Sequence, residues 1–176
     1  SHKFVAQETT KKPYTALELA GRDIYIREGC YTCHSQMVRP IKAEVLRYGP
    51  KSELDDSIYD HPFQWGSRRI GPDLARVGGK YPDIWHFRHM EDPRSMAPGS
   101  IMPNYPWLLK NNLDYGILEK KLRVMQTLGV PYSDENAEHA LEDAKAQALE
   151  IGKNLDPSID AKKISKKEII AVIAYL

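Results

Sequence analysis

Apolar residues recur at intervals of three and four positions in several stretches of the chain, with polar residues between them. This spacing places the apolar side chains on one face of an α-helix. Almost no stretch alternates apolar and polar residues as a β-strand would. The pattern therefore predicts an all-α protein, with helices within residues 14–30, 82–92, 112–131, 133–152 and 165–176.

Several residues at the edges of these stretches are of types that begin or end helices. Gly29 and Gly152 follow apolar stretches and are expected to end helices, because glycine readily adopts the left-handed conformation found after a helix. Ser133 is expected to cap the N-terminus of the helix that follows it. Ser165 and Glu168 have the spacing of a capping box, which predicts the start of the last helix.

Composition changes this picture little. A chain of 176 residues most simply forms one domain, and its 41% apolar and 28% charged residues are ordinary for a globular protein. The net charge of +1 predicts no particular partner and gives no sign of nucleic-acid binding. No apolar run is long enough to span a membrane. The last helix runs to Leu176 without a capping residue, so we expect an excised domain.

The sequence CYTCH at residues 30–34 contains both cysteines of the chain. Cysteines at positions i and i+3 lie on one face of a helical turn, where both can form thioethers to the vinyl groups of one porphyrin. The histidine at i+4 lies on the same face and can ligate the iron. Cys-x-x-Cys-His is the attachment motif of c-type haem. We therefore predict one covalently attached haem c, held by Cys30 and Cys33, with His34 as the proximal metal ligand.

Two other kinds of site can contain a Cys-x-x-Cys pair. A thioredoxin-like redox dithiol requires a strand before the motif, whereas an amphipathic helix is predicted before Cys30. A zinc site requires a fourth ligand, for which His86 or His89 is a candidate in the absence of a second Cys or His pair. The haem interpretation is favoured over both.

The second axial ligand of such a haem can be a methionine or a histidine. Met102 is favoured because prolines stiffen its loop, residues 98–106, so that little conformational entropy is lost when the thioether meets the iron. Met96 is the main alternative among the methionines. His86 or His89 would give a bis-histidine haem of lower potential.

The order of these features resembles a class I cytochrome c. In that family the helix before the haem motif crosses the C-terminal helix, and Gly21 would permit a close crossing. The segment GPDLARVGGKY at residues 71–81 resembles the family's GPxLxxVxGR segment, whose proline carbonyl accepts the ring N–H of the proximal histidine. The resemblance implies a class I cytochrome c-like fold, in which Pro72 belongs to the cofactor site and fixes the tautomer of His34.

Four further segments narrow the resemblance to one family. Over residues 16–176 the chain is similar to the mono-haem subunit, CcoO/FixO type, of cbb3-type cytochrome c oxidases. The segments are SQMVRP, YDHPFQWGSRRIGPDLARVGG, HMEDPRSMAPGSIMPNYPWL and LGVPYSDE. The resemblance implies a long insert after the haem motif and extra helices before the C-terminal helix. It also implies that residues 1–15 follow a membrane anchor and that residues 16–176 form the cytochrome c domain.

The resemblance implies a function as well as a fold. In this family the subunit relays electrons from a diheme subunit, or from a soluble cytochrome c, to the catalytic subunit that reduces oxygen. The diheme and catalytic subunits are therefore the expected partners. The protein is expected to be an enzyme subunit whose isolated domain only transfers electrons. Its expected location is the periplasmic side of the bacterial inner membrane, through an anchor outside the given residues.

Other functions stay open. The cytochrome subunit of nitric oxide reductases shares the GPDL and MPNY patterns, although the segment YDHPFQWGSRR argues against it, and a free-standing periplasmic cytochrome c would use the same motif. A peroxidase-like enzyme would need an exchangeable sixth ligand. The arginines of the insert could neutralise haem propionates or pair with a partner's carboxylates. Five residues have undecided roles: Arg39, His61, Trp65, Arg68 and Arg69.

Replacing Met102 by alanine tests the distal ligand. We expect Met102→Ala to abolish the thioether-to-iron absorption band near the red end of the spectrum, because the sulfur that produces the band is removed. The same substitution at Met96 serves as the comparison. A band left intact in Met102→Ala would exclude Met102 as the ligand.

Overall fold

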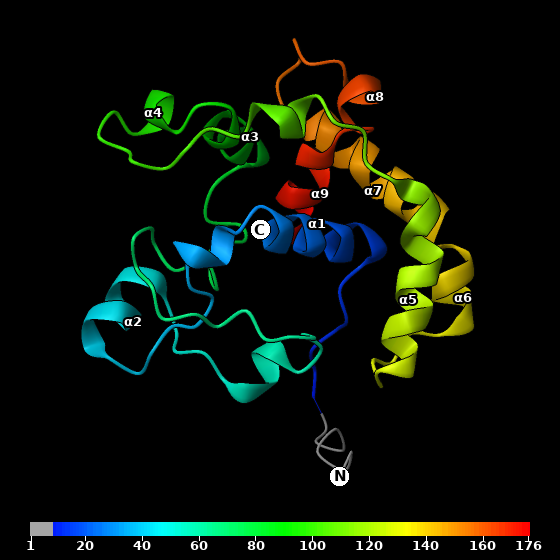
Figure 1. Cartoon of the computed structure of the whole chain (residues 1–176), viewed down its shortest axis with the longest axis horizontal. Helices are drawn as coiled ribbons and strands as arrows, with labels where there is room; N and C mark the ends of the chain where they lie inside the picture. Colours follow the sequence, from blue (N-terminus) through cyan, green and yellow to red (C-terminus); the bar gives the residue numbers. More distant parts are fainter. Residues whose placement is uncertain (1–8) are drawn as a thin grey trace.

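The computed structural model describes residues 9–176, so residues 1–8 of the predicted segment 1–15 lie outside the described part (Figure 1). Within residues 9–176 the regular structure is helical, with an isolated bridge between Asn112 and Lys167 and no β-strand. The all-α prediction is confirmed. The α-helices are Ala16–Arg27 (α1), Lys42–Tyr48 (α2), Asp83–Glu91 (α3), Pro93–Met96 (α4), Leu118–Thr127 (α5), Asp134–Glu138 (α6), Ala140–Asn154 (α7), Ala161–Ile164 (α8) and Glu168–Tyr175 (α9). The 3-10 helices are Cys30–Thr32 (η2), Leu54–Ser57 (η3), Pro106–Leu109 (η4) and Tyr115–Ile117 (η5).

Local sequence explains where α1 begins and ends. At its start, the Thr15 side chain accepts the backbone N–H of Glu18, and the Glu18 carboxylate accepts the backbone N–H of Thr15 at 2.9 Å. This reciprocal capping box satisfies two N–H groups that have no partner within the helix. After the helix, the chain turns at Gly29 with φ of 71°, as predicted, because glycine adopts this conformation without steric cost. The turn leads directly to Cys30.

Helix α9 crosses α1 at the centre of the molecule (Figure 1). The two backbones approach so closely that a Cβ atom on Gly21 would lie 1.8 Å from the carbonyl oxygen of Ala171. Beside this contact, the rings of Tyr25 and Tyr175 meet edge to face with their centroids 5.4 Å apart. The predicted crossing is confirmed, and it requires a residue without a side chain at position 21.

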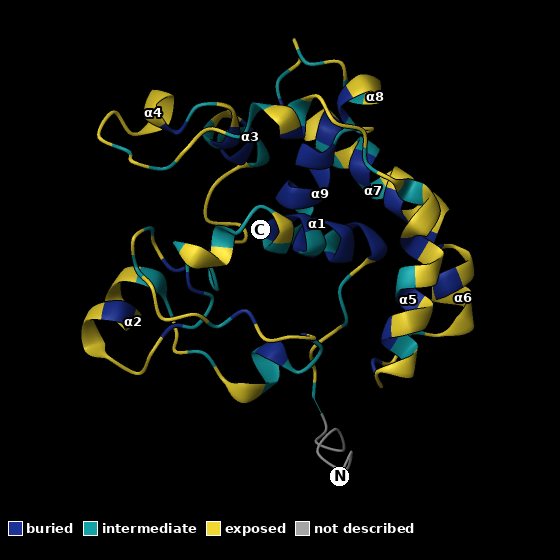
Figure 2. Ribbon diagram, in the orientation of Figure 1, coloured by how far each residue is buried: buried dark blue, intermediate teal, exposed yellow. Residues whose placement is uncertain are grey.

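Several other helices pack around this crossed pair. Helices α5 and α7 contact α1, and α3 contacts α9. Buried residues lie on the inner faces of α1, α7 and α9, whereas α2, α5 and α6 carry many exposed residues (Figure 2). None of the helices within residues 9–176 combines the length and the apolar character needed to cross a membrane. The large apolar side chains that are fully buried include Leu17, Tyr25, Val38, Leu108, Leu118, Ile169 and Ile170.

The capping box predicted for the last helix is wrong. Ser165 ends the short helix α8, where its Oγ donates to the carbonyl oxygen of Lys162 at 3.2 Å. Helix α9 begins at Glu168, whose carboxylate accepts hydrogen bonds of 2.7 and 2.8 Å from the Arg27 guanidinium. The Glu168 carboxylate, which the sequence pattern assigned to a capping box, is therefore bound by Arg27 of α1 instead.

The helix predicted within residues 133–152 also differs in detail. Ser133 caps α6 as predicted, but the helix is interrupted at His139, and α7 continues past Gly152 to Asn154. Gly152 therefore does not end the helix. It allows α8 to pack closely, since a Cβ atom at this position would lie 3.0 Å from the carbonyl oxygen of Ala161.

A buried ion pair attaches the segment after the haem motif to α1. The Arg22 Nε donates to Asp60 Oδ1 at 2.7 Å, and the two residues are 2% and 6% exposed. The same guanidinium donates to the carbonyl oxygens of His61 and Pro62. Removing one partner of a buried pair leaves an uncompensated charge, so Arg22 and Asp60 together hold this part of the segment in place.

The crossing predicts a large cost for any side chain at position 21. We expect Gly21→Ala to lower the free energy of unfolding by about 1–3 kcal/mol or more, because the added Cβ overlaps rigid backbone and forces the helices apart. Gly99→Ala is the matched control, since a Cβ at that position meets no atom within 4 Å. Chemical denaturation measures both. Equal stabilities of the two variants would contradict the close crossing.

Candidate functional site

The haem motif forms a helical turn immediately after α1. The backbone N–H groups of Cys33 and His34 both donate to the carbonyl oxygen of Cys30, at 3.2 and 2.9 Å. These bonds are the 3-10 and α-helical types, so the three residues occupy one turn, as the spacing of the motif predicts. Both cysteines are free and half-buried. The turn therefore presents two thiols and one imidazole together.

The ring of His34 contacts two residues that are distant in sequence, Gly71 and Pro72. Its Nδ1 lies 2.8 Å from the carbonyl oxygen of Pro72. Because a carbonyl can only accept, Nδ1 carries the proton and Nε2 keeps its lone pair available for a metal. A Cβ atom on Gly71 would lie 2.2 Å from His34 Cε1, so the glycine backbone is packed against the ring. The geometry agrees with the predicted position of Pro72, while its role beside a haem stays a prediction.

Asp73 fastens the segment of Pro72 to the haem motif. Its Oδ2 accepts the Ser35 hydroxyl at 2.6 Å and the backbone N–H of Met37 at 2.9 Å, and its Oδ1 accepts the backbone N–H of Ala75 at 2.9 Å. Asp73 and Ser35 are both buried. Sequence reasoning missed Asp73 and Gly71, although an acid inside the GPDL segment was a signal for one of them. Together they fix the Pro72 carbonyl in front of His34.

The Cys30 thiol lacks the lowered pKa that a redox dithiol requires. Burial, together with the nearby Glu28 carboxylate, raises the pKa of the Cys30 thiol to about 12. A thioredoxin-like site depends on a lowered thiol pKa, because the thiolate is the nucleophile. Within residues 9–176, no group of three or more His, Cys, Asp or Glu side chains is arranged to hold a metal ion. The zinc alternative therefore gains no support from the described part of the chain.

The predicted distal ligand lies on the loop that follows α4. Met102 is half-buried and packs against the hydrophobic core, whereas Met96 is 38% exposed. The backbone N–H of Tyr105 donates to the carbonyl oxygen of Met90 at 2.8 Å, so the loop returns to the end of α3. Figure 1 shows this loop extending from α3 and α4. The assignment of Met102 as the distal ligand stays a prediction.

The two histidines of α3 are the other candidate ligands. His86 is 5% exposed and His89 is half-buried. Burial lowers the pKa of both imidazoles, and the neighbouring His34 and His86 lower the pKa of His89 further. The His89 Nδ1 is buried and has no hydrogen-bond partner among the described residues. Both rings are therefore neutral at pH 7.

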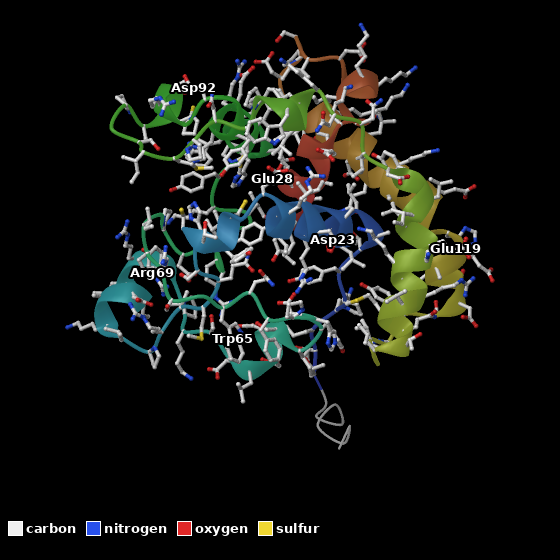
Figure 3. The ribbon with its side chains drawn as sticks, viewed as in Figure 1. Asp23, Glu28, Trp65, Arg69, Asp92 and Glu119 are labelled. Atoms are coloured by element: carbon white, nitrogen blue, oxygen red, sulfur yellow. The ribbon has the colours of Figure 1, made fainter. Side chains whose placement is uncertain are left out.

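Most of the undecided residues of the insert have partners within the chain. The Arg39 guanidinium holds the pKa of the Glu44 carboxyl at about 2, and Arg39 Nε donates to it at 2.6 Å. Arg69 donates to Glu44 at 3.0 Å and to the carbonyl oxygen of Met37 at 2.9 Å (Figure 3). These contacts occupy both arginines without any cofactor.

The tryptophan of the insert, Trp65, is anchored by its ring nitrogen. Trp65 Nε1 donates to Ser57 Oγ at 3.0 Å, and its ring stacks on Phe63 with centroids 4.6 Å apart (Figure 3). His61 and Arg68 are exposed, and Arg68 makes no ion pair within residues 9–176. Their roles stay undecided.

The residues present fit a c-type haem. The turn supplies two free thiols, the His34 imidazole is oriented by a carbonyl oxygen, and Gly71 leaves no side chain against the ring. A proximal histidine whose other nitrogen is hydrogen-bonded is the usual arrangement at haem and metal sites. With the crossed α1 and α9, these features are those of a mono-haem cytochrome with a class I cytochrome c-like fold.

The family model described as "Cytochrome C oxidase, mono-heme subunit/FixO" matches residues 1–176. The chain therefore belongs to the family of mono-haem subunits of cbb3-type cytochrome c oxidases. No match was found among curated proteins. The predicted family and the predicted fold class are confirmed. Membership indicates one haem, a part in electron transfer, and other oxidase subunits as partners.

A substitution at position 71 tests whether the Gly71 backbone confines the His34 ring. We expect Gly71→Ala to displace the imidazole, because the new Cβ would overlap three of its ring atoms. The axial-ligand spectrum should change and a smaller fraction of the protein should retain low-spin haem. Gly116→Ala is the control, since its Cβ would meet only the Asp114 side chain at 3.4 Å. A Gly71→Ala spectrum identical to that of the control would show that the ring is not confined in this way.

Proposed function

We propose that this chain transfers electrons through one haem c, attached to Cys30 and Cys33 and ligated by His34 and Met102. The observation that carries the proposal is the bond between His34 Nδ1 and the Pro72 carbonyl oxygen, because it leaves Nε2 as a donor to a metal. The haem supplies a reversible one-electron couple. The chain supplies binding, orientation and electrostatics.

Hydrogen bonds on the proximal side support this proposal, because they limit movement of the segment that contacts His34. Asp73 is bonded to Ser35 and Met37, so the Pro72 carbonyl cannot move independently of the haem motif. Two further backbone bonds join the same segments, from Gly71 to Cys33 at 2.9 Å and from Leu74 to Ser35 at 2.8 Å. An electron carrier benefits because little reorganisation then accompanies the change of charge. No acid–base pair is needed, since no proton is transferred to a substrate.

In this proposal the chain relays electrons within the oxidase. A diheme subunit, or a soluble cytochrome c, is the donor, and the oxygen-reducing catalytic subunit is the acceptor. Residues 16–176 form the haem domain on the periplasmic side of the bacterial inner membrane, and residues 1–15 connect it to a membrane anchor. Family membership supports this proposal, because it makes the chain a subunit of an oxidase. The domain alone transfers electrons and does not reduce oxygen.

An absorption spectrum combined with the mass of the intact chain tests the proposal. We expect the mass of the intact chain to include one haem, which stays attached when the protein is denatured. We also expect the spectrum of low-spin haem. The reduced protein should resist carbon monoxide, because a bound methionine closes the sixth position. Rapid oxygen consumption by the isolated protein, or a mass without haem, would overturn the proposal.

A pair of histidine variants supplies the matched control. His34→Ala should lose the low-spin spectrum, because its Nε2 is the proposed proximal ligand. His139→Ala should retain it, since this histidine lies between α6 and α7 with a side chain that is 56% exposed. Equal spectra for the two variants would exclude His34 as an iron ligand.

A further inference from the structure

The Arg69 guanidinium joins three segments on the proximal side, where it lies beside α2 (Figure 3). Its Nη2 atom donates to the carbonyl oxygen of Met37 at 2.9 Å and to Glu44 Oε2 at 3.0 Å. The same atom lies 3.6 Å from Asp73 Oδ2. Met37 follows the haem motif, Glu44 belongs to α2, and Asp73 follows Pro72. One nitrogen atom therefore meets oxygen atoms from three separate parts of the chain.

Arg69 and Asp73 together bind both backbone polar groups of Met37. The Met37 carbonyl oxygen accepts from Arg69, and the Met37 N–H donates to Asp73 Oδ2 at 2.9 Å. The Ser35 hydroxyl donates to the same carboxylate oxygen at 2.6 Å. The chain leaving the haem motif therefore cannot separate from residues 69–75 without breaking these bonds.

The Asp73 carboxylate needs a cation close to it, because its side chain has no exposed surface. A buried charge is costly unless hydrogen bonds and an opposite charge compensate it. Three hydrogen bonds compensate part of the cost, from Ser35 Oγ and from the backbone N–H groups of Met37 and Ala75. Arg69 supplies the positive charge, and its own side chain is only 18% exposed.

The position of Asp73 determines the position of the carbonyl oxygen that binds His34. Pro72, the preceding residue, accepts the His34 Nδ1–H at 2.8 Å. Gly71, one residue earlier, packs its backbone against the same ring. A displacement of Asp73 toward solvent would carry the Pro72 carbonyl away from the imidazole, because the two residues are adjacent in the chain.

The structure assigns to Arg69 the role of a positioning residue for the proximal ligand: it keeps Asp73 in place, and Asp73 keeps the Pro72 carbonyl on His34 Nδ1. This inference rests on the proposed function, which makes His34 the proximal ligand. All three contacts of Arg69 involve one nitrogen atom, so the role requires a cation with several donors. A lysine ammonium has three donors and can meet the same oxygen atoms, whereas an uncharged amide cannot balance the carboxylate.

Three variants of the haem-bearing protein test this role. Arg69→Gln removes the charge but keeps a polar side chain, and Arg69→Lys keeps the charge. Arg68→Gln is the matched control, since Arg68 is the adjacent residue, is exposed and makes no ion pair within residues 9–176. Hydrogen exchange is followed by NMR in the reduced protein at His34 Nδ1–H and at the Met37 amide. The amide of Ile173, which is buried in α9, reports opening of the whole domain.

We expect both N–H groups to exchange at least about 10-fold faster in Arg69→Gln, because the uncompensated Asp73 charge favours local opening. The Ile173 amide should change by a smaller factor. Arg69→Lys and Arg68→Gln should stay within about 3-fold of the unsubstituted protein.

Unchanged exchange at His34 Nδ1–H in Arg69→Gln would overturn the inference. Equal acceleration at His34 and Ile173 would also overturn it, because it would indicate a general loss of stability. Equal rates in Arg69→Gln and Arg69→Lys would show that the charge is not required, and would contradict the role as well.

A second pair of variants keeps the test available if Arg69→Gln does not fold. Asp73→Asn removes the charge that Arg69 balances, so adding Arg69→Gln to it creates no unpaired buried carboxylate. Because Arg69 acts through Asp73, the added substitution should change the His34 Nδ1–H exchange rate by less than about 3-fold. An added acceleration of about 10-fold or more would overturn the inference, because Arg69 would then act by another route.

Failure of the proposed function gives a different result. An unsubstituted chain without covalent haem would overturn the proposed function, whatever the exchange rates. A chain that carries covalent haem, and whose His34 Nδ1–H exchange is insensitive to Arg69→Gln, would overturn the role of Arg69 alone.

Discussion

The contact between α1 and α9 at Gly21 determines where the rest of the molecule can lie. Two backbones in direct contact leave no freedom in the distance between the helices, and the Arg27 bond to Glu168 holds the end of α1 to the start of α9. The haem motif follows α1 after a single glycine turn at Gly29. Its position relative to the core is therefore set by the helix crossing.

A second constraint acts on the proximal side of the site. The segment containing Pro72 has no regular secondary structure, and it is held by hydrogen bonds to the haem motif through Asp73. The buried pair of Arg22 and Asp60 holds the intervening insert against α1. Loops without helices can thus be as well defined as helices, provided that their polar groups are paired inside the protein.

Some residues of the proposed site could be predicted from the sequence, and others could not. Cys30, Cys33 and His34 lie within one turn, so their proximity follows from spacing alone. The position of Pro72 was predicted only through resemblance to a family, because thirty-odd residues separate it from His34. Gly71 and Asp73 were missed, since the reason for each is a contact with a distant part of the chain. The burial of His89 Nδ1 without a partner among residues 9–176 was also beyond sequence reasoning, because it depends on how the chain folds around it.

The sequence by itself determined the all-α class, the approximate positions of the helices and the haem-attachment turn. These depend on contacts within a few residues, such as the capping box of Thr15 and Glu18 and the spacing of the motif. The tertiary structure alone decided the start of α9, the interruption at His139, and the seat of the His34 ring. The start of α9 and the position of the His34 ring depend on groups far apart in the chain, whose mutual distance is set only when the helices pack.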